Sequence, residues 1–284
     1  MTTLTPYWTL TKPGITRLVT LTAGAGFWLG ARGDPDLGRL ALALVGTGLV
    51  VGGTNALNQW WERDADARMD RTRGRPLPAG RLRPGAALAF AVVISLAGIA
   101  WLALFVNALT TLLAAVSLAT YVFAYTPLKR RTPAALFVGA VPGALPILGG
   151  WTAAGAGLTA AGWVLFAILF LWQIPHFLAL GWLYREDYVR GGFAMLSRND
   201  STGSITAAQA LWFTAALVAA SLLPAGVGLA GLPYVGAAAV LGVALVASSV
   251  ALWRAPTPAA ARRLFVASVA YLPGLLLLLA GLPR

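Results

Sequence analysis

Oxygen-bearing side chains recur every four residues in one segment of the chain. Asn58, Glu62, Asp66 and Asp70 are spaced in this way. Residues four apart lie on one face of an α-helix, and each step drifts by about 40°. We therefore expect the first three to converge, with Asp70 at the fraying end of the row. Like charges at this spacing repel unless a cation lies among them.

A divalent metal ion would relieve this repulsion. The row offers only oxygen ligands and the chain has no cysteine, which favours Mg²⁺, with Mn²⁺ as the alternative. Mg²⁺ is commonly held by a few carboxylates together with substrate phosphates. Five arginines that suit a phosphate group follow in the same segment: Arg63, Arg68, Arg71, Arg73 and Arg75. The alternative interpretation is a solvated helix end of mixed charge.

A second basic cluster follows Tyr125 and consists of Lys129, Arg130 and Arg131. Basic residues at a helix C-terminus complement the helix dipole and anchor the helix at lipid headgroups. Lys129 and Arg130 are also candidates for binding an anionic substrate group. Residue type and position alone leave both interpretations open.

The only histidine, His176, lies in the apolar segment Trp172-Gln173-Ile-Pro-His176. A neutral imidazole inside a membrane helix could be hydrogen-bonded to a neighbouring helix. Polar residues at membrane depth are also functional candidates, and imidazole ligates iron.

The composition shows what must position these residues. Of 284 residues, 58% are hydrophobic and 11% are charged, and the mean hydropathy is +0.76. These values exclude a soluble globular enzyme, a disordered chain and a coiled coil. The absence of cysteine excludes disulfides and thiolate chemistry. We expect no cleavable signal peptide, because the first apolar run is long enough to stay in the membrane.

Nine apolar runs of about bilayer length predict an all-α, polytopic membrane bundle that forms one domain over residues 1–284. The predicted spans are 15–31, 40–60, 86–106, 108–125, 134–151, 161–183, 205–223, 233–253 and 264–281.

The net charge of +12 would suggest a nucleic-acid partner in a soluble protein. In a membrane protein the basic residues set the orientation instead. With a cytoplasmic N-terminus, 18 of the 21 lysines and arginines fall inside, and only Arg32, Arg39 and Arg284 fall outside. We therefore expect the cytoplasmic membrane as location, the lipid bilayer as partner, no nucleic acid, and the chemistry on the cytoplasmic face.

The first motif resembles that of the UbiA-type intramembrane prenyltransferases. Asn58-x-x-x-Glu62-x-x-x-Asp66 is followed by Arg71-Thr-Arg-Gly-Arg75-Pro-Leu-Pro. That superfamily holds Mg²⁺ and an isoprenoid diphosphate with an Asn-x-x-x-Asp-x-x-x-Asp motif, so Glu62 is a departure of equal charge. The resemblance implies that Arg71, Arg75, Lys129 and Arg130 bind the diphosphate, and it implies a bundle of nine helices.

Further motifs are similar to those of the haem O synthase branch. Gln173 and His176 stand where other members have a second Asp-rich motif, and Thr11-Lys12-Pro13 and Gly192-Phe193 fit the same branch. Gly14 departs from the basic residue expected there, and Arg17 follows one turn later. The resemblance implies farnesyl transfer from farnesyl diphosphate to a vinyl group of protohaem IX, with Gln173 and His176 contacting substrate. It also implies a haem A synthase or an oxidase-assembly protein as partner.

Two other functions compete with this one. A related enzyme could prenylate an aromatic acid or a quinone precursor, although it would normally carry the second Asp-rich motif. A transporter could use helices broken at Pro142, Pro146 and Pro175. We see no inverted repeat in the sequence, which disfavours the transporter.

Overall fold

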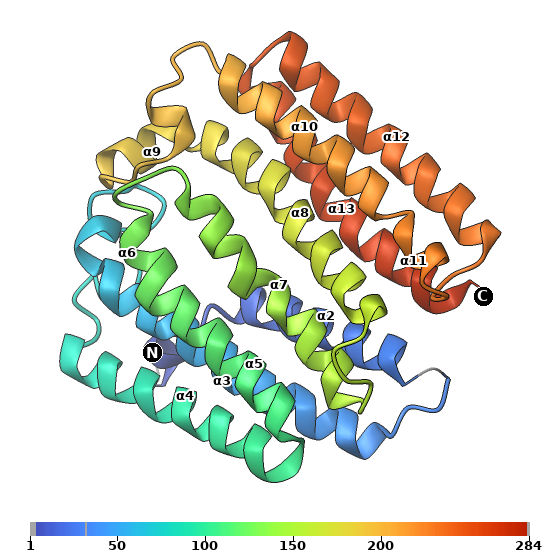
Figure 1. Cartoon of the computed structure of the whole chain (residues 1–284). Helices are drawn as coiled ribbons and strands as arrows, with labels where there is room; N and C mark the ends of the chain where they lie inside the picture. Colours follow the sequence, from blue (N-terminus) through green and yellow to red (C-terminus); the bar gives the residue numbers. More distant parts are fainter. Residues whose placement is uncertain (1–3, 32, 283–284) are drawn as a thin grey trace. The chain divides into compact units, whose positions relative to one another are not determined.

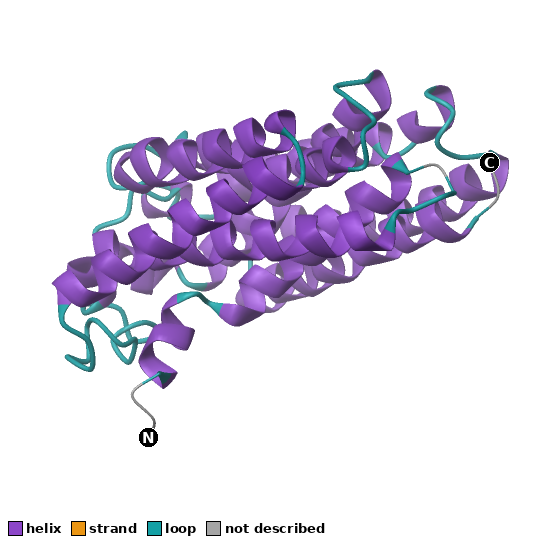
Figure 2. Ribbon diagram, turned by 90° about the horizontal axis from the view of Figure 1, so that it is seen from below, coloured by secondary structure: helices purple, strands orange, loops and turns teal. Residues whose placement is uncertain are grey.

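The protein is helical throughout the residues that its structure, a computed structural model, describes: 4–31 and 33–282. Figures 1 and 2 show helices joined by loops, with no strand in these ranges. The helices are α1 (Thr5–Leu10), α2 (Pro13–Gly30), α3 (Leu37–Asp66), α4 (Pro84–Phe105), α5 (Ala108–Ala119), the π-helix η1 (Thr120–Tyr125), α6 (Thr126–Leu128), α7 (Ala135–Ala153), α8 (Ala160–Leu183), α9 (Arg185–Arg190), the 3₁₀-helix η2 (Leu196–Arg198), α10 (Ser204–Ala220), α11 (Leu223–Gly226), α12 (Leu232–Arg254) and α13 (Pro258–Gly281).

The chain divides into two compact helical units. The first comprises residues 1–157 and 186–193, and the second comprises residues 158–185 and 194–284. In the first unit α3 packs along α4, and α7 packs against α2 and α5. In the second unit α8 packs against α10 and α13, and α12 packs against the same two helices.

Eight helices among the described residues are long and apolar enough to cross a membrane. Each contains or overlaps one of the predicted spans. The remaining predicted span, 15–31, corresponds to α2, whose 18 residues include Arg17 and three threonines. The all-helical membrane fold is thus confirmed, while the count of nine and the orientation stay predictions. Of the three arginines expected outside, Arg32 and Arg284 lie outside the described residues.

The helix starts follow from local chemistry. The side chains of Asp36, Asn107, Thr159 and Thr257 each accept a bond from a backbone N–H in the first turn of α3, α5, α8 and α13. These bonds satisfy N–H groups that have no partner inside the helix. Proline occupies the first position of α2, α4 and α13, where its fixed φ suits a helix and its missing N–H costs nothing.

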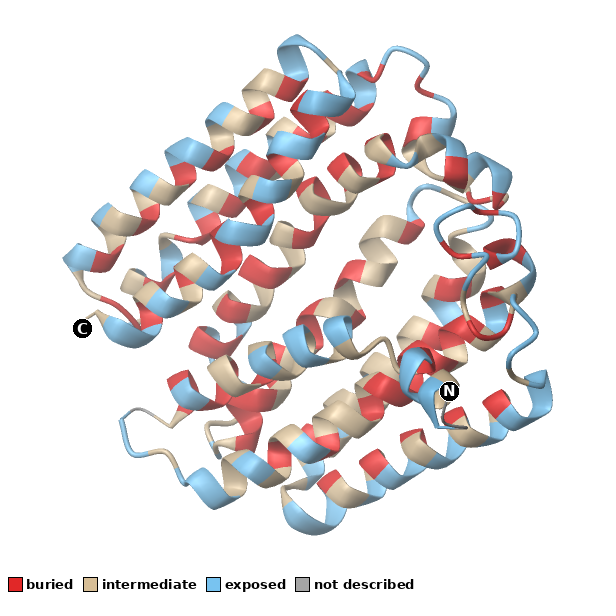
Figure 3. Cartoon of the chain, turned by 180° about the vertical axis from the view of Figure 1, so that it is seen from behind, coloured by how far each residue is buried: buried red, intermediate tan, exposed pale blue. Residues whose placement is uncertain are grey.

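The share of buried residues differs between helices packed among other helices and helices at the edge of the bundle. In the apolar window of α7, 61% of residues are buried, against 11% in the span formed by α5 to α6. Figure 3 shows exposed residues along one side of α4 and of α12, where large apolar side chains such as Val93 and Val240 meet the surroundings. Such exposed apolar surface suits a lipid environment.

The prolines do not break the long helices. Pro142 and Pro146 lie inside the continuous α7, and Pro175 lies inside the continuous α8. A transporter that used half-helices to bind its substrate would require interruptions at such positions. The geometry therefore removes the observation that favoured the transporter.

Two glycines allow α2 and α7 to approach closely. A Cβ on Gly150 would overlap the backbone carbonyl of Ala23, and a Cβ on Gly26 would overlap that of Ile147. Small residues at such crossings let helix backbones touch in membranes, where van der Waals packing drives association. By contrast, a Cβ on Gly149 would meet nothing within 4 Å.

We predict that Gly150→Ala lowers the free energy of unfolding by about 1–3 kcal/mol, because the added methyl group forces backbone apart. Gly149→Ala is the matched control and should be neutral or slightly stabilising, since alanine is the better helix former. Thermal unfolding of both variants in the same detergent measures the difference. Equal stabilities would contradict the close contact between α2 and α7.

Candidate active site

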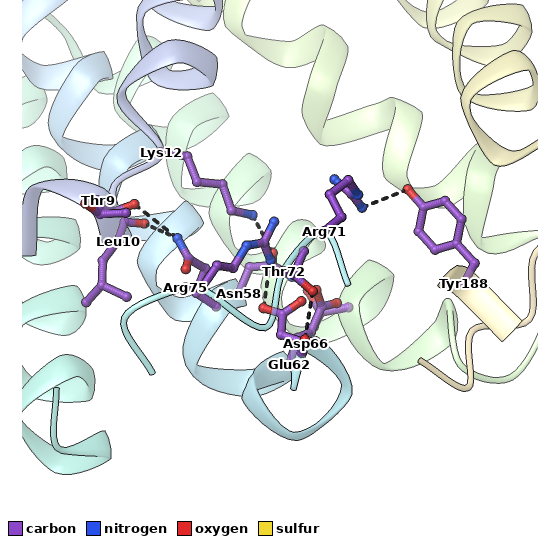
Figure 4. A network of polar contacts seen from close by, with 12 residues as sticks. Thr9, Leu10, Lys12, Asn58, Glu62, Asp66, Arg71, Thr72, Arg75 and Tyr188 are labelled. Carbon is purple, nitrogen blue, oxygen red and sulfur yellow. Dashed lines mark hydrogen bonds and ion pairs between the residues drawn. The ribbon is translucent and has the colours of Figure 1, made fainter. Parts of the chain in front are cut away.

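The polar row predicted on α3 lies at its C-terminal end and is buried. Asn58 and Asp66 are each 1% exposed and Glu62 is 5% exposed. Figure 4 shows the three side chains close together, with Lys12 and Arg75 beside them. The spacing of four therefore places the three residues as expected, on one face of one helix.

Each of these residues contacts one basic side chain. The ammonium group of Lys12 donates to Oδ1 of Asn58 at 2.8 Å. Lys129 forms an ion pair with Glu62. Arg75 donates from Nη1 to Oδ2 of Asp66 at 2.7 Å. The three basic residues come from different parts of the chain, so the fold brings the site together.

Three basic side chains face two carboxylates in this cluster. Burial, followed by the nearby cation of Arg75, lowers the pKa of Lys12 to about 7. Burial also opposes the charge of Lys129, but the carboxylate of Glu62 holds the pKa of Lys129 above its usual value. Lys12 is therefore only partly protonated near neutral pH, and an anion bound beside it would favour its charged form.

A π-helix positions Lys129. The segment η1 leads into the short helix α6, after which Lys129 follows at once. Asn58 donates from Nδ2 to the hydroxyl of the buried Thr126 at 3.3 Å, and that hydroxyl donates to the carbonyl of Tyr121. π-Helical turns are rare and occur often at functional sites. The extra residue in this turn brings the end of the span against α3.

Two aromatic rings flank the Lys129 ammonium. Its Nζ lies 5.2 Å from the ring centre of Tyr125 and 4.8 Å from that of Phe193. Cation–π contacts of this kind hold a cation without neutralising it. Lys129 therefore keeps its charge available to a further anion.

The loop after α3 folds back over the row. The hydroxyl of Thr72 donates to the carbonyl of Asp66 at 2.9 Å, which places Arg75 beside the Asp66 carboxylate. Arg68 donates to the carbonyl of Gly191 at 3.2 Å. The loop after α3 and the segment after α8 thus meet through residues 68–71 and 187–191.

Asp70 lies away from the other three residues of the row. Its carboxylate pairs with Arg190 at 2.7 Å and with Arg73 at 3.5 Å, and it is exposed. Its backbone N–H donates to Asp187, whose pKa lies below its usual value because bonds from Arg190 and from this N–H outweigh its desolvation. The role of Asp70 as a metal ligand stays a prediction.

The other predicted phosphate-binding residues lie near this loop. Arg71 donates to the hydroxyl of Tyr188 at 3.4 Å and lies over its ring. Arg130 is exposed, with its guanidinium within 4 Å of the position that a Cβ on Gly192 would take. The φ of Gly192 is +75°, a conformation that favours glycine. Arg17 is exposed and donates to the Pro13 carbonyl of its own helix.

The donor set at the row fits a hard divalent cation. Among the described residues no three acidic, histidine or cysteine side chains gather to form a metal cage. The row instead offers two carboxylates and one amide oxygen, which matches the preference of Mg²⁺ for few protein ligands. Oε1 of Glu62 is buried and pairs with the ammonium group of Lys129.

Gln173 and His176 belong to α8 in the second unit. Gln173 is buried and donates to the carbonyl of Leu169 at 3.1 Å. Nδ1 of His176 lies 2.9 Å from the hydroxyl of Ser268 on α13. His176 is thus hydrogen-bonded between helices, as one of the two interpretations of the sequence expected.

The bonding of Ser268 fixes the tautomer of His176. The Ser268 hydroxyl donates to the Phe265 carbonyl at 2.7 Å, so it accepts from Nδ1–H of the imidazole. Nε2 then carries the lone pair. The imidazole ring stacks on Trp172 at 4.8 Å and lies tilted against Phe265 at 4.8 Å. The imidazole is thus held between the rings of Trp172 and Phe265.

Sequence reasoning did not assign three of the residues at the site. Lys12 stood in a motif noted for its resemblance alone, and its left-handed φ of 48° could not be foreseen. Thr126 carried no signal, since a threonine before proline is common at helix ends. Phe193 was part of a motif, but its contact with Lys129 depends on a fold between distant segments.

Comparison with known proteins places the chain in a family. The model of the UbiA prenyltransferase family matches residues 18–272. A protoheme IX farnesyltransferase of Solibacter usitatus (strain Ellin6076) is 47% identical over 284 residues, covering 96% of this chain and 97% of the relative.

Solved structures show the same fold. A structure described for digeranylgeranylglyceryl phosphate synthase superposes with a TM-score of 0.82 at 18% identity, covering 99% of this chain and 98% of the other. A UbiA homolog from Archaeoglobus fulgidus bound to GPP and Mg²⁺ superposes with a TM-score of 0.71 at 14% identity, covering 97% and 99%. The fold, the buried polar row and the similarity over nearly the whole chain agree: this multi-pass membrane protein belongs to the UbiA prenyltransferase family.

Proposed function

We propose that the chain is a metal-dependent protohaem IX farnesyltransferase. It transfers the farnesyl group of farnesyl diphosphate to a vinyl group of protohaem IX, with water, and gives haem O and diphosphate. The observation that carries this proposal is the buried row Asn58–Glu62–Asp66, with a basic side chain against each member. The relatives named protoheme IX farnesyltransferase support the choice of substrates.

The basic residues bind the diphosphate. Lys129 and Arg75 are the principal ligands, and Lys12 adds a third cation at the row. Arg71 and Arg130 contribute at the surrounding loop. Positive charge fixed where the leaving group forms stabilises the transition state of an ionising allylic diphosphate. The farnesyl carbocation is then attacked by the vinyl group, and water adds to complete the hydroxyethylfarnesyl side chain with loss of a proton.

Asn58, Glu62 and Asp66 hold the metal ion. Mg²⁺, or Mn²⁺ in its place, would supply a Lewis acid that neutralises the leaving diphosphate. Asp70 would join these ligands only if its ion pairs with Arg73 and Arg190 opened. No step requires a covalent bond to the protein, which agrees with a chain without cysteine.

The diphosphate and the metal ion depend on each other for binding. Before either binds, Lys129 and Arg75 occupy the carboxylates of Glu62 and Asp66. A diphosphate offers these two cations a more highly charged partner, and their departure frees carboxylate oxygens. A metal ion alone would instead add positive charge to a site whose two carboxylates are already paired with Lys129 and Arg75. We therefore expect tight metal binding only when diphosphate is present.

Gln173 and His176 act on the acceptor. Nε2 of His176 ligates the haem iron, and the flat rings of Trp172 and Phe265 hold the imidazole in place. Gln173 presents a buried amide on the same helix. These two residues would distinguish protohaem from an aromatic acid or a quinone precursor.

The enzyme lies in the cytoplasmic membrane with its site facing the cytoplasm, as the distribution of basic residues indicates. Its product leaves for a haem A synthase or an oxidase-assembly protein. Copurification of such a protein from detergent extracts tests this partner, and its absence under conditions that retain activity would exclude a stable complex.

The purified chain in detergent, incubated with protohaem IX, farnesyl diphosphate and Mg²⁺, tests the function directly. Chromatography and mass analysis of extracted haems should reveal a haem heavier by one farnesyl group plus water, and EDTA should abolish it. Prenylation of an aromatic acid with no new haem would refute the acceptor. Failure to release diphosphate with any acceptor would refute the prenyltransferase activity itself.

Asp66→Asn should lower kcat in this assay at least about 100-fold, because a charged metal ligand at the leaving group is lost. Asp64→Asn is the matched control on the same helix, since the Asp64 side chain is 80% exposed and should keep full activity. Thermal unfolding of both variants should show folded protein. Equal activities of the two variants would contradict the assignment of Asp66.

His176→Ala should weaken protohaem binding about tenfold or more and shift the haem absorption spectrum, because an axial ligand is lost. Ser268→Ala should have a smaller effect, since it removes only the bond that orients the imidazole. Optical titration with protohaem measures both. An unchanged spectrum and affinity in His176→Ala would exclude iron ligation.

A further inference from the structure

The chain reaches Lys12 through an unusual backbone turn. Lys12 lies between α1 and α2 with φ 48° and ψ 65°, and it is the only described residue other than glycine with a positive φ. The left-handed conformation is unfavourable for a lysine. Such conformations persist where the surroundings hold them, and they cluster at functional sites.

Two amide side chains of α3 hold the segment that precedes Lys12. Gln59 donates from Nε2 to the carbonyls of Leu10 at 2.9 Å and of Thr9 at 3.3 Å. Asn55 donates from Nδ2 to the hydroxyl of Thr16 at 3.1 Å and, at 3.4 Å, to the carbonyl of Thr11. Helix ends leave their last carbonyls without partners inside the helix. Gln59 supplies a partner for Leu10, while the carbonyls of Thr9 and Thr11 also accept from the Lys12 N–H at 3.1 Å and the Thr16 hydroxyl at 2.6 Å.

Apolar packing fixes the same segment. Leu10 is fully buried, in a cluster with Ala56, Leu77, Ala87 and Ala91. Figure 4 shows Thr9 and Leu10 on one side of Lys12, and Asn58 at the end of its side chain. Packing alone would bury Leu10 with any backbone conformation at residue 12. The turn has its own backbone bonds, from Lys12 N–H to the Thr9 carbonyl at 3.1 Å and from Thr16 N–H to the Lys12 carbonyl at 3.0 Å. The amide bonds from Asn55 and Gln59 tie this turn to α3.

The two amides form a second row on α3. Asn55 and Gln59 are four residues apart, and their row lies beside the row of Asn58, Glu62 and Asp66 on the same helix. One row faces the N-terminal turn and the other contains the candidate metal ligands. The helix therefore sets the distance between the Lys12 turn and the metal ligands.

The amide oxygen of Gln59 has no hydrogen-bond partner although it is buried. The Gln59 side chain is 2% exposed. A buried unsatisfied acceptor is destabilising, and an apolar residue of the same size would avoid it. Methionine would avoid this cost, but it would remove the two bonds that Gln59 donates to the carbonyls of Leu10 and Thr9.

We infer that Gln59 and Asn55 are positioning residues: they hold the turn at residues 9–12 so that the Lys12 ammonium meets the diphosphate at the metal ligands. This inference rests on the proposed function. It assigns to the N-terminal turn a role in binding the prenyl donor, and it makes the effect of Gln59 dependent on Lys12.

A double-mutant cycle tests the dependence. Binding of a non-reactive farnesyl thiodiphosphate with Mg²⁺ is measured by calorimetry on the full chain in detergent. Lys12→Met and Gln59→Met should each raise Kd about tenfold, the loss expected for one bond to a charged group. The double variant should bind no more weakly than Lys12→Met alone.

Thr54→Val is the matched control, because Thr54 is buried on the same helix and bonds only within it. It should bind the probe as the wild type does. Protohaem affinity should be unchanged in Gln59→Met, which a general loss of structure would not allow. If Gln59→Met does not fold, Asn55→Leu replaces it in the cycle.

Two results would overturn the inference: wild-type affinity in Gln59→Met, or an equal loss from Gln59→Met in the wild-type and Lys12→Met backgrounds. Both leave the proposed function standing, because the wild type still binds the probe. Failure of the wild type to bind the probe would overturn the proposed function, and the inference with it.

Discussion

Burial of Glu62 and Asp66 at the end of a membrane-spanning helix is the constraint on which the site depends. An ion taken out of water costs several kcal/mol unless it is paired and hydrogen-bonded. The protein meets this cost with Lys129 and Arg75, each in contact with one carboxylate, while Lys12 lies against the neighbouring Asn58. In the proposed function the same cations bind the diphosphate, so one set of pairs would serve both the fold and the substrate.

Three irregular elements of the first unit bring these basic residues to α3. The left-handed turn at Lys12, the π-helix before Lys129 and the loop that returns Arg75 to Asp66 are each departures from regular helix. Each one brings a basic residue from a different part of the chain to α3. In the same unit the backbones of α2 and α7 cross in close contact at Gly26 and Gly150.

The helical membrane fold could be predicted because a backbone in lipid must satisfy its own hydrogen bonds, which favours helices. The apolar runs of bilayer length mark where these helices lie. The row Asn58, Glu62 and Asp66 could be predicted because its spacing acts within one helix. Contacts between segments could not be predicted in this way. No local sequence pattern shows that Lys129 pairs with Glu62 or that Asp70 pairs with Arg190. The π-helix at 120–125 also has no local signal in the sequence. Those features depend on packing between residues far apart in sequence. The resemblance supplied candidates such as Arg75, and the structure supplied their partners.

The proposed function requires that Lys129 and Arg75 leave the carboxylates of Glu62 and Asp66 when diphosphate binds. Electron paramagnetic resonance of Mn²⁺ with the purified chain tests it, with and without a non-reactive farnesyl thiodiphosphate. We expect weak Mn²⁺ binding alone and at least about tenfold tighter binding with the diphosphate, which corresponds to about 1.4 kcal/mol of coupling. Equal Mn²⁺ affinity in both conditions would contradict it.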